Sequence, residues 1–260
     1  MALVEEESRS AAVRVEDLTL GYGDRVVLEA VDLTIWRGEI VTILGGSGCG
    51  KSTLLKAMIG LLPPLKGSIA LGGRIITGSG NEDNLALARK KIGVLFQSGA
   101  LMGSLTLAEN VALPIQELTT LSAELVDDLV RLKLEMVGLT GFDTLLPAEL
   151  SGGMRKRAAL ARAMALDPEI LFCDEPSAGL DPVTSAELDQ LLLELKRALG
   201  ITMVLVTHEL PSIEAISDRC VMLDGKVRGI IAVGTPAELR EGSTDPRVQA
   251  FFHRRSRPRT

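Results

Sequence analysis

The chain has 260 residues, of which 46% are hydrophobic and 24% charged, and this much apolar material excludes a disordered chain. The 28 basic and 34 acidic residues give a net charge of −6, which argues against the basic surface expected of a nucleic-acid-binding domain. Aromatic residues make up only 3%, so Val, Leu, Ile and Ala must build the core, and the 26 glycines indicate tight turns or anion-binding loops. The three cysteines are too few and too scattered for a disulfide framework or a zinc cluster.

Neither a transmembrane helix nor a signal peptide is expected. Apolar runs stay shorter than the roughly 18 residues that a membrane span requires. The first residues include Glu5, Glu6 and Glu7 and no apolar segment of the kind that signal peptides contain. We therefore expect the chain to remain where it is made, or to be held at a membrane by another polypeptide.

Strands and helices alternate along most of the chain, which predicts an α/β fold with a parallel sheet covered by helices. The first two strands alternate in polarity and predict an antiparallel pair, whereas most later strands are short buried runs. Between residues 98 and 150 helical periodicity dominates, as at Leu125, Leu129, Leu132 and Met136, and predicts a mostly helical insert. In chain order the predicted strands are residues 13–20, 26–36, 40–44, 67–76, 92–96, 170–173, 202–207 and 220–223. The other predicted helices are residues 51–59, 154–165, 183–199 and 211–216.

A phosphate-binding P-loop is predicted over residues 45–52, which read Gly-Gly-Ser-Gly-Cys-Gly-Lys-Ser. The segment stands between a predicted strand and a predicted helix, the context that a P-loop requires. Glycines let successive N–H groups point inward, and the helix N-terminus adds positive potential, so that phosphate oxygens are cradled. Lys51 can bridge the β- and γ-phosphates, and the hydroxyl of Ser52 can ligate Mg²⁺.

Two further segments can be assigned a possible role because a P-loop precedes them in the chain. Residues 170–175 end in Asp174 and Glu175; alone this is an ordinary strand end, but here Asp174 can hold Mg²⁺ through water and Glu175 can polarise an attacking water. Residues 150–154 read Leu-Ser-Gly-Gly-Met before a helix, which is either a generic N-cap or a second anion site. Two such sites leave two arrangements open: both contact one ATP within a chain, or each ATP is shared between two chains.

The order of these motifs resembles the ATP-binding cassette (ABC) ATPases over about residues 13–240. Residues 45–52, Gln97, 150–154, 174–175, 177–181 and His208 are similar to the Walker A, Q-loop, signature, Walker B, D-loop and H-loop motifs. Met154 replaces the usual Gln of the signature and Gly46 a common Pro, and neither change removes a phosphate ligand. The resemblance implies a P-loop NTPase core with an antiparallel β subdomain and a helical subdomain.

The resemblance also assigns roles to single residues. Tyr22, the one tyrosine of the chain, would stack on adenine, and His208 would reach the γ-phosphate. Catalysis would use Glu175, His208, Lys51 and Gln97. The Mg²⁺ ligands would be Ser52, Gln97 and Asp174. The residues that would contact nucleotide are Tyr22, Gly45, Gly46, Ser47, Gly48, Cys49, Gly50, Lys51, Ser52, Thr53, Ser151, Gly152, Gly153 and Asp181.

A finer resemblance concerns residues 96–101, 147–150, 150–155 and 245–248, which look like the ATPases of bacterial lipid transporters of the Mla and Mce-associated systems. It implies an ATPase that dimerises on Mg-ATP and drives a separate membrane permease, with an MCE-domain protein and a STAS-domain subunit as partners. It would then lie on the cytoplasmic side of the bacterial inner membrane, attached through the permease, whose helix would be received near residues 98–107. The alternatives are an importer ATPase for another solute, such as an amino acid, and a non-transport ABC ATPase.

We predict an ABC ATPase domain over residues 13–241, a helical subdomain within it over roughly 98–165, and a C-terminal tail over 242–260. The end of this tail contains Arg254, Arg255, Arg257 and Arg259, which fits either a frayed end or contact with lipid headgroups or a partner. His253 has no motif around it and is expected to be a surface residue.

Overall fold

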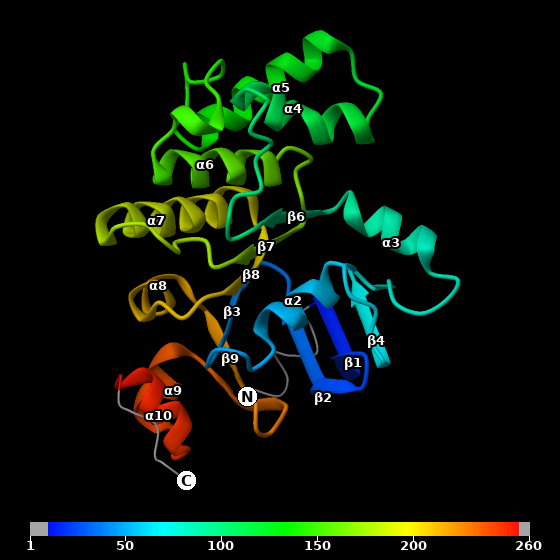
Figure 1. The fold of residues 1–260 in the computed structure, drawn as a ribbon, viewed down its shortest axis with the longest axis vertical. Helices are drawn as coiled ribbons and strands as arrows, with labels where there is room; N and C mark the ends of the chain where they lie inside the picture. The colour runs from blue at the N-terminus through cyan, green and yellow to red at the C-terminus, as the bar shows by residue number, and fades with distance from the viewer. Residues whose placement is uncertain (1–9, 255–260) are drawn as a thin grey trace. The chain divides into compact units, whose positions relative to one another are not determined.

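The computed structural model describes residues 10–254. The chain divides into two compact units, the first formed by the residues up to Ala88 together with those from Thr202 onward, the second by Arg89–Ile201 (Figure 1). The arginines at 255, 257 and 259 lie outside the described residues.

An antiparallel sheet with the strand order β2-β1-β4-β5 lies in the first unit. Its register pairs Leu18 with Val31 and Val15 with Ile69, and these side chains are buried because alternate residues of each strand face the core. The predicted single strand over 67–76 is wrong in one respect: it turns back at Gly72 and Gly73, both in the left-handed region at φ +54° and +80°. The bounds are β1 Ala11–Tyr22, β2 Arg25–Trp36, β4 Lys66–Leu71 and β5 Arg74–Ile75.

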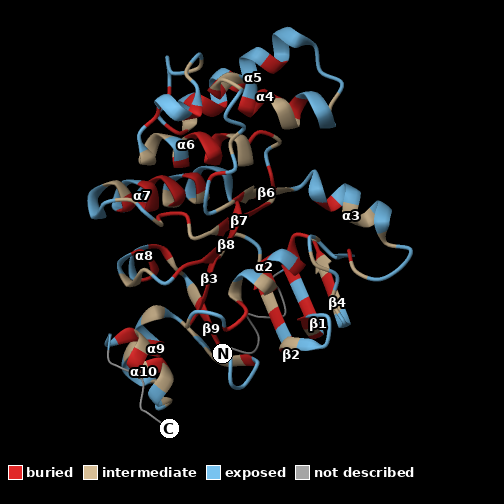
Figure 2. Ribbon diagram, viewed as in Figure 1, coloured by how far each residue is buried: buried red, intermediate tan, exposed pale blue. Residues whose placement is uncertain are grey.

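Four further strands of this unit lie side by side in the order β10-β9-β3-β8, as part of a six-stranded sheet. β3 is parallel to both neighbours and fully buried, which explains why its sequence is a continuous apolar run rather than an alternating one (Figure 2). The predicted strands of this sheet are confirmed, and β10 was not predicted. The bounds are β3 Ile40–Gly45, β8 Thr202–Val206, β9 Arg219–Asp224 and β10 Gly229–Gly234.

Helices of the first unit pack on these strands. Val248 and Phe252 of α10 join Leu44, Ile213 and Met222 in one buried cluster, so part of the segment predicted as a tail belongs to the core. His253, which follows α10, is exposed as expected. The helices are α2 Lys51–Met58, α8 Leu210–Ile216, α9 Pro236–Gly242 and α10 Pro246–Phe252, with α3 Glu82–Arg89 at the boundary to the second unit.

The second unit joins two parallel strands, β6 Ile92–Leu95 and β7 Ile170–Asp174, to a group of helices. Helices α4, α5 and α6 pack on one another, and α6 packs on α7 (Figure 1). Capping explains several helix starts: Thr106 and Glu109 form a reciprocal capping box, and Ser122 caps α5. The helices are α4 Leu107–Leu118, α5 Ala123–Met136, η1 Pro147–Glu149, α6 Gly152–Ala163 and α7 Pro182–Leu199.

The apolar repeat that predicts α5 lies on the solvent side of this helix. Leu125 is 51% exposed and Leu132 is 48% exposed, whereas the opposite face, with Val126, Val130 and Leu134, is buried (Figure 2). The predicted helix is confirmed, and the repeat does not coincide with the buried face, because α5 has apolar residues on two faces and periodicity alone cannot select between them.

None of the helices that the structure describes has the length and apolar character that a bilayer crossing requires.

Candidate nucleotide-binding and hydrolysis site

The P-loop lies between β3 and α2, the strand and helix that its sequence predicts. Gly45, Gly48 and Gly50 adopt φ angles of +143°, +74° and +105°, which side chains other than glycine rarely accept. The Nζ of Lys51 donates to the carbonyl oxygens of Gly45 at 3.0 Å and Gly46 at 3.2 Å. The ammonium therefore lies over the loop, where phosphate oxygens would offer it charged acceptors.

Close packing is a second reason for the glycine at position 45. This residue pairs with Leu223 in the β3–β9 ladder, and a Cβ on it would stand 2.5 Å from the Sγ of Cys49. Cys49 is itself buried, so the loop is held against the sheet from within. Ser52 and Thr53 follow in the first turn of α2, Ser52 exposed and Thr53 partly buried, while Ser47 is exposed at the top of the loop.

His208 emerges at the same sheet edge as the P-loop. β8 runs parallel to β3 with Val206 opposite Ile43, so both strands end on one side, and His208 follows β8 after the buried Thr207. Its side chain is exposed. Tyr22 ends β1 in the same unit with 50% of its surface exposed, as a ring available for stacking must be.

Gln97 and the two carboxylates leave the ends of neighbouring strands in the second unit. β6 and β7 are parallel, with Leu95 opposite Cys173, so Gln97 and Asp174-Glu175 follow paired positions. Glu175 has φ +47°, a left-handed conformation that is strained in a residue with a side chain.

Two cations of α6 hold these loops, and the sequence analysis missed both. Lys156 donates from Nζ to the carbonyls of Gln97 at 2.6 Å and Glu175 at 3.3 Å. Arg162 donates to the carbonyls of Ala100 at 2.5 Å and Gly99 at 3.0 Å. Burial lowers the pKa of Arg162. No motif marks such residues, because they bind backbone atoms rather than particular side chains.

The signature segment opens α6. The Ser151 hydroxyl accepts from the backbone N–H of Met154 at 3.2 Å, so the N-cap alternative is confirmed, and it is compatible with an anion site. Gly152 and Gly153 occupy the first helical turn.

Asp181 caps α7 in the same way. One carboxylate oxygen accepts from the N–H groups of Val183 and Thr184 at 3.0 and 3.1 Å, and the other accepts from the Thr184 hydroxyl at 2.5 Å. The Thr184 hydroxyl bond is the main reason that the pKa of Asp181 is lowered. Capping thus accounts for this aspartate structurally, and its contact with nucleotide stays a prediction.

A thiol stands directly before the paired carboxylates. Burial raises the pKa of Cys173 to about 12, and the neighbouring charge of Asp174 adds to the rise. Cys173 is therefore neutral at ordinary pH, and a neutral buried thiol is a poor nucleophile and a poor metal ligand.

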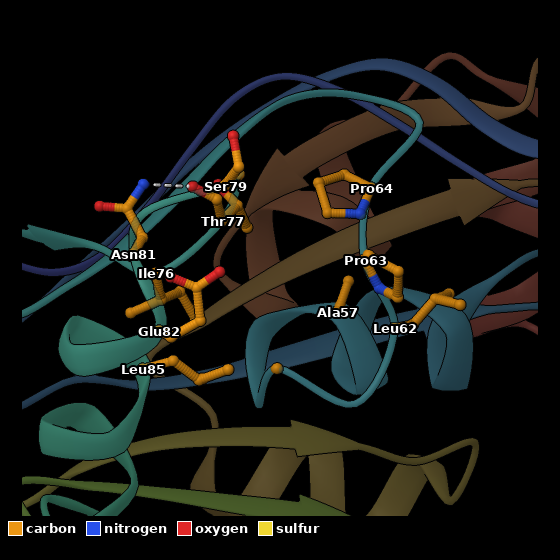
Figure 3. Close-up of a pocket in the computed structure, with 12 residues that line it drawn as sticks. Ala57, Leu62, Pro63, Pro64, Ile76, Thr77, Ser79, Asn81, Glu82 and Leu85 are labelled. Atoms are coloured by element: carbon orange, nitrogen blue, oxygen red, sulfur yellow. Dashed lines mark hydrogen bonds between the residues drawn. The ribbon is translucent and has the colours of Figure 1, made fainter.

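The pocket drawn in Figure 3 is a separate feature of the first unit and contains none of the predicted site residues. It has a volume of about 370 Å³ and lies among the end of α2, the following proline-containing loop and the segment leading into α3. Asn81 donates to the Thr77 carbonyl at 2.8 Å and shapes one wall (Figure 3).

A glycine loop after a buried parallel strand, with a lysine folded over it, defines the class of P-loop nucleoside triphosphatases. The chain belongs to the ABC transporter family, whose model matches residues 28–178. It is an ATP-binding, ATP-hydrolysing subunit of this family, in agreement with the motif order.

Three known proteins illustrate the relationship. The chain is 42% identical over 247 residues to "Intermembrane phospholipid transport system ATP-binding protein MlaF" of Escherichia coli strain K12, covering 95% of this chain and 90% of that protein. It is 43% identical over 245 residues to "Probable ribonucleotide transport ATP-binding protein mkl" of Mycobacterium tuberculosis strain H37Rv, covering 94% and 67%. The dimeric structure of the cassette MJ0796, in a post-hydrolysis state with ADP and Pi, superposes with a TM-score of 0.77 at 32% identity, covering 86% and 98%.

Proposed function

We propose that this chain is the ATPase subunit of a phospholipid transport system of the bacterial envelope. The observation that carries the proposal is the 42% identity to the phospholipid transport protein MlaF, which extends over 95% of the chain and 90% of that relative. A match of this extent includes both compact units, and so includes the helical part as well as the P-loop.

A bound Mg²⁺ ion fits the donors that the chain offers. The proposed ligands are the Ser52 hydroxyl, the Gln97 amide and the Asp174 carboxylate, a set of hard oxygen donors of the kind that Mg²⁺ prefers. Asp174 ends β7 and Gln97 follows the paired strand β6, which supports a common role. The ion would neutralise charge on the β- and γ-phosphates of ATP.

The side chains around it have distinct proposed tasks. The P-loop N–H groups and Lys51 bind the phosphates, and Tyr22 stacks on adenine. Glu175 accepts a hydrogen bond from the attacking water and polarises it, while His208 donates to the γ-phosphate. Glu175 is partly buried, which excludes part of the bulk water from its surroundings.

We further propose that each ATP is shared between the P-loop of one copy and Ser151–Gly153 of a second copy. The dimer described for MJ0796 supports this arrangement. Glu175→Gln keeps the shape and removes the carboxylate, so it is expected to bind ATP, to lose hydrolysis by about 10²-fold or more, and to accumulate as a dimer.

Adding Ser151→Arg to Glu175→Gln separates the shared site from a single-chain site. The long side chain obstructs the partner's γ-phosphate, so the double variant should bind ATP as a monomer and fail to dimerise. The matched control, Ser151→Ala, removes the N-cap and destabilises α6 by about 1 kcal/mol without adding bulk. Light scattering and nucleotide titration with Mg-ATP distinguish the cases. If the monomeric double variant loses ATP binding while the Ser151→Ala control keeps it, each ATP is not shared between two copies.

The proposed partners are a membrane permease, an MCE-domain protein and a STAS-domain subunit. Through the permease the chain would lie at the cytoplasmic face of the bacterial inner membrane. The name of the relative MlaF describes an intermembrane transport system, which supports the proposal that this chain works in a membrane complex. The MCE-domain and STAS-domain partners are proposed from the finer resemblance alone.

Purification of the native complex tests the substrate class. We expect mass spectrometry of the detergent-extracted complex to find a permease, an MCE-domain protein and bound phospholipid. A complex that instead contains a soluble amino-acid-binding protein, or retains ribonucleotide as its transported cargo, would refute the lipid assignment. Because ATP binding is measured separately on the isolated chain, that result would leave the ATPase assignment intact.

A further inference from the structure

Lys156 is a buried cation in the second turn of α6, five residues after the serine that caps this helix. Its side chain is almost removed from water, with 7% of the residue surface exposed. A buried ammonium group is stable only where polar acceptors replace its hydration, and here the acceptors include two backbone carbonyls, those of Gln97 and Glu175.

These two carbonyls belong to the loops that follow β6 and β7. The ladder between the strands pairs Leu95 with Cys173, and the residues that follow pass out of the ladder. Beyond the ladder Lys156 connects the two loops, with Nζ 2.6 Å from the Gln97 oxygen and 3.3 Å from the Glu175 oxygen. Hydrogen bonds from a charged donor are stronger than neutral ones, and the shorter of the two bonds, to the Gln97 carbonyl, anchors the ammonium beside the Glu175 carbonyl.

The backbone of Glu175 needs such support. Its φ of +47° is a left-handed conformation, which is strained in a residue with a side chain and persists only where neighbouring groups hold it. Rotation of this peptide would turn the carbonyl away from Lys156 and redirect the carboxylate. The bond from Lys156 opposes that rotation.

We propose that Lys156 is a positioning residue for ATP hydrolysis, whose ammonium sets the orientation of Glu175 and Gln97 together by holding their carbonyls. The inference rests on the roles proposed above for these two side chains. Since α6 begins at the signature segment, Lys156 also links that segment to both loops within the second unit.

The test is Lys156→Met, which keeps the length of the side chain and removes the charge and its hydrogen bonds. We expect kcat, normalised to titrated nucleotide-binding sites of the full-length chain, to fall about 10- to 100-fold, because a small misplacement of a reacting group has effects of this size. KM for ATP should stay within about twofold, because the P-loop, which binds the phosphates, is unchanged.

Lys133→Met is the matched control. Lys133 is also a buried lysine of the second unit, with 1% of its surface exposed, and its Nζ lies 2.5 Å from a carboxylate oxygen of Asp167, away from the catalytic loops. This variant should lose thermal stability and keep its kcat per nucleotide site. An equal loss of kcat in both variants would refute a positioning role for Lys156 and indicate a general effect of destabilisation.

A double variant separates this inference from the proposed function. The part of the effect that passes through Glu175 is already lost in Glu175→Gln, so Lys156→Met should slow Glu175→Gln by a clearly smaller factor than it slows the parent chain, because residues that act as a unit are not additive. Multiplicative effects would refute the inference. Retention of hydrolysis by Glu175→Gln would refute the proposed role of Glu175 itself, whereas a normal kcat for Lys156→Met with inactive Glu175→Gln would refute only the inference. Where Lys156→Met fails to bind nucleotide, Lys156→Gln, which removes the charge and keeps an uncharged amide donor on a shorter side chain, replaces it. The expected result is then a smaller loss of kcat with KM for ATP within about twofold, and an unchanged kcat would refute the inference.

Discussion

Gly153 has no room for a side chain, because α7 lies directly against it. A Cβ at this position would stand 2.5 Å from the Cγ2 of Thr184, whereas carbon atoms in contact are separated by about 3.5–4.0 Å. Gly153→Ala must therefore push α6 and α7 apart or distort Thr184. Such overpacking destabilises proteins by about 1–3 kcal/mol, offset by roughly 0.5–1 kcal/mol of improved helix propensity. We expect a net loss of about 1–2 kcal/mol in the free energy of unfolding.

A double-mutant cycle tests this explanation. Its second substitution, Thr184→Ser, removes the methyl group that would overlap the new Cβ and keeps the hydroxyl that donates to Asp181 at 2.5 Å. Alone it should cost at most about 0.8 kcal/mol for the lost methyl group. Combined with Gly153→Ala it should relieve the overlap, so that the double variant is more stable than the sum of the single effects by about 1–2 kcal/mol. Urea unfolding of all four proteins measures this coupling. Effects that add within about 0.5 kcal/mol would refute the steric explanation and leave phosphate binding as the reason for this glycine.

Two further predictions concern the loop after Gln97 and the buried thiols. Met102 is 50% exposed, whereas the carbonyl of Leu105 is held by the amide of Asn110, so Met102 is the residue chosen for substitution in this loop. We expect Met102→Glu to abolish capture of the permease in a pull-down while the isolated chain keeps its ATPase activity. Full capture of the permease would contradict a permease contact at this loop. Burial raises the pKa values of Cys173 and Cys220 to about 12, above the ordinary thiol value, so the unfolded chain ionises first and stability should fall as pH rises from about 9 to about 12. Iodoacetamide at pH 8 should label these two thiols only after unfolding, and rapid labelling of the native protein would show that they are accessible.

The P-loop, the alternation of strands and helices, and the order of the motifs could all be predicted from the amino-acid sequence. These features are local: a glycine loop between an apolar strand and a helix constrains its own backbone, and a buried parallel strand requires a continuous apolar run. The family comparison agrees, since the ABC transporter model matches residues 28–178. The turn at Gly72-Gly73 was not predicted although its signal is local, because Ile75 and Ile76 follow so soon that the whole segment looks like one strand.

Contacts between residues that are far apart in the sequence could be assigned only from the tertiary structure. Both faces of α5 contain apolar residues, and only packing against α4 and α6 selects Val126 and Val130 for the core and leaves Leu125 exposed. Lys156 bonds to carbonyls 59 and 19 residues away, and backbone carbonyls occur at every residue, so no sequence pattern identifies its partners. The buried Lys133 is equally invisible in the sequence, since its partner Asp167 lies 34 residues away. Where a contact depends on which segments the fold brings together rather than on neighbouring residue types, only the folded chain defines it.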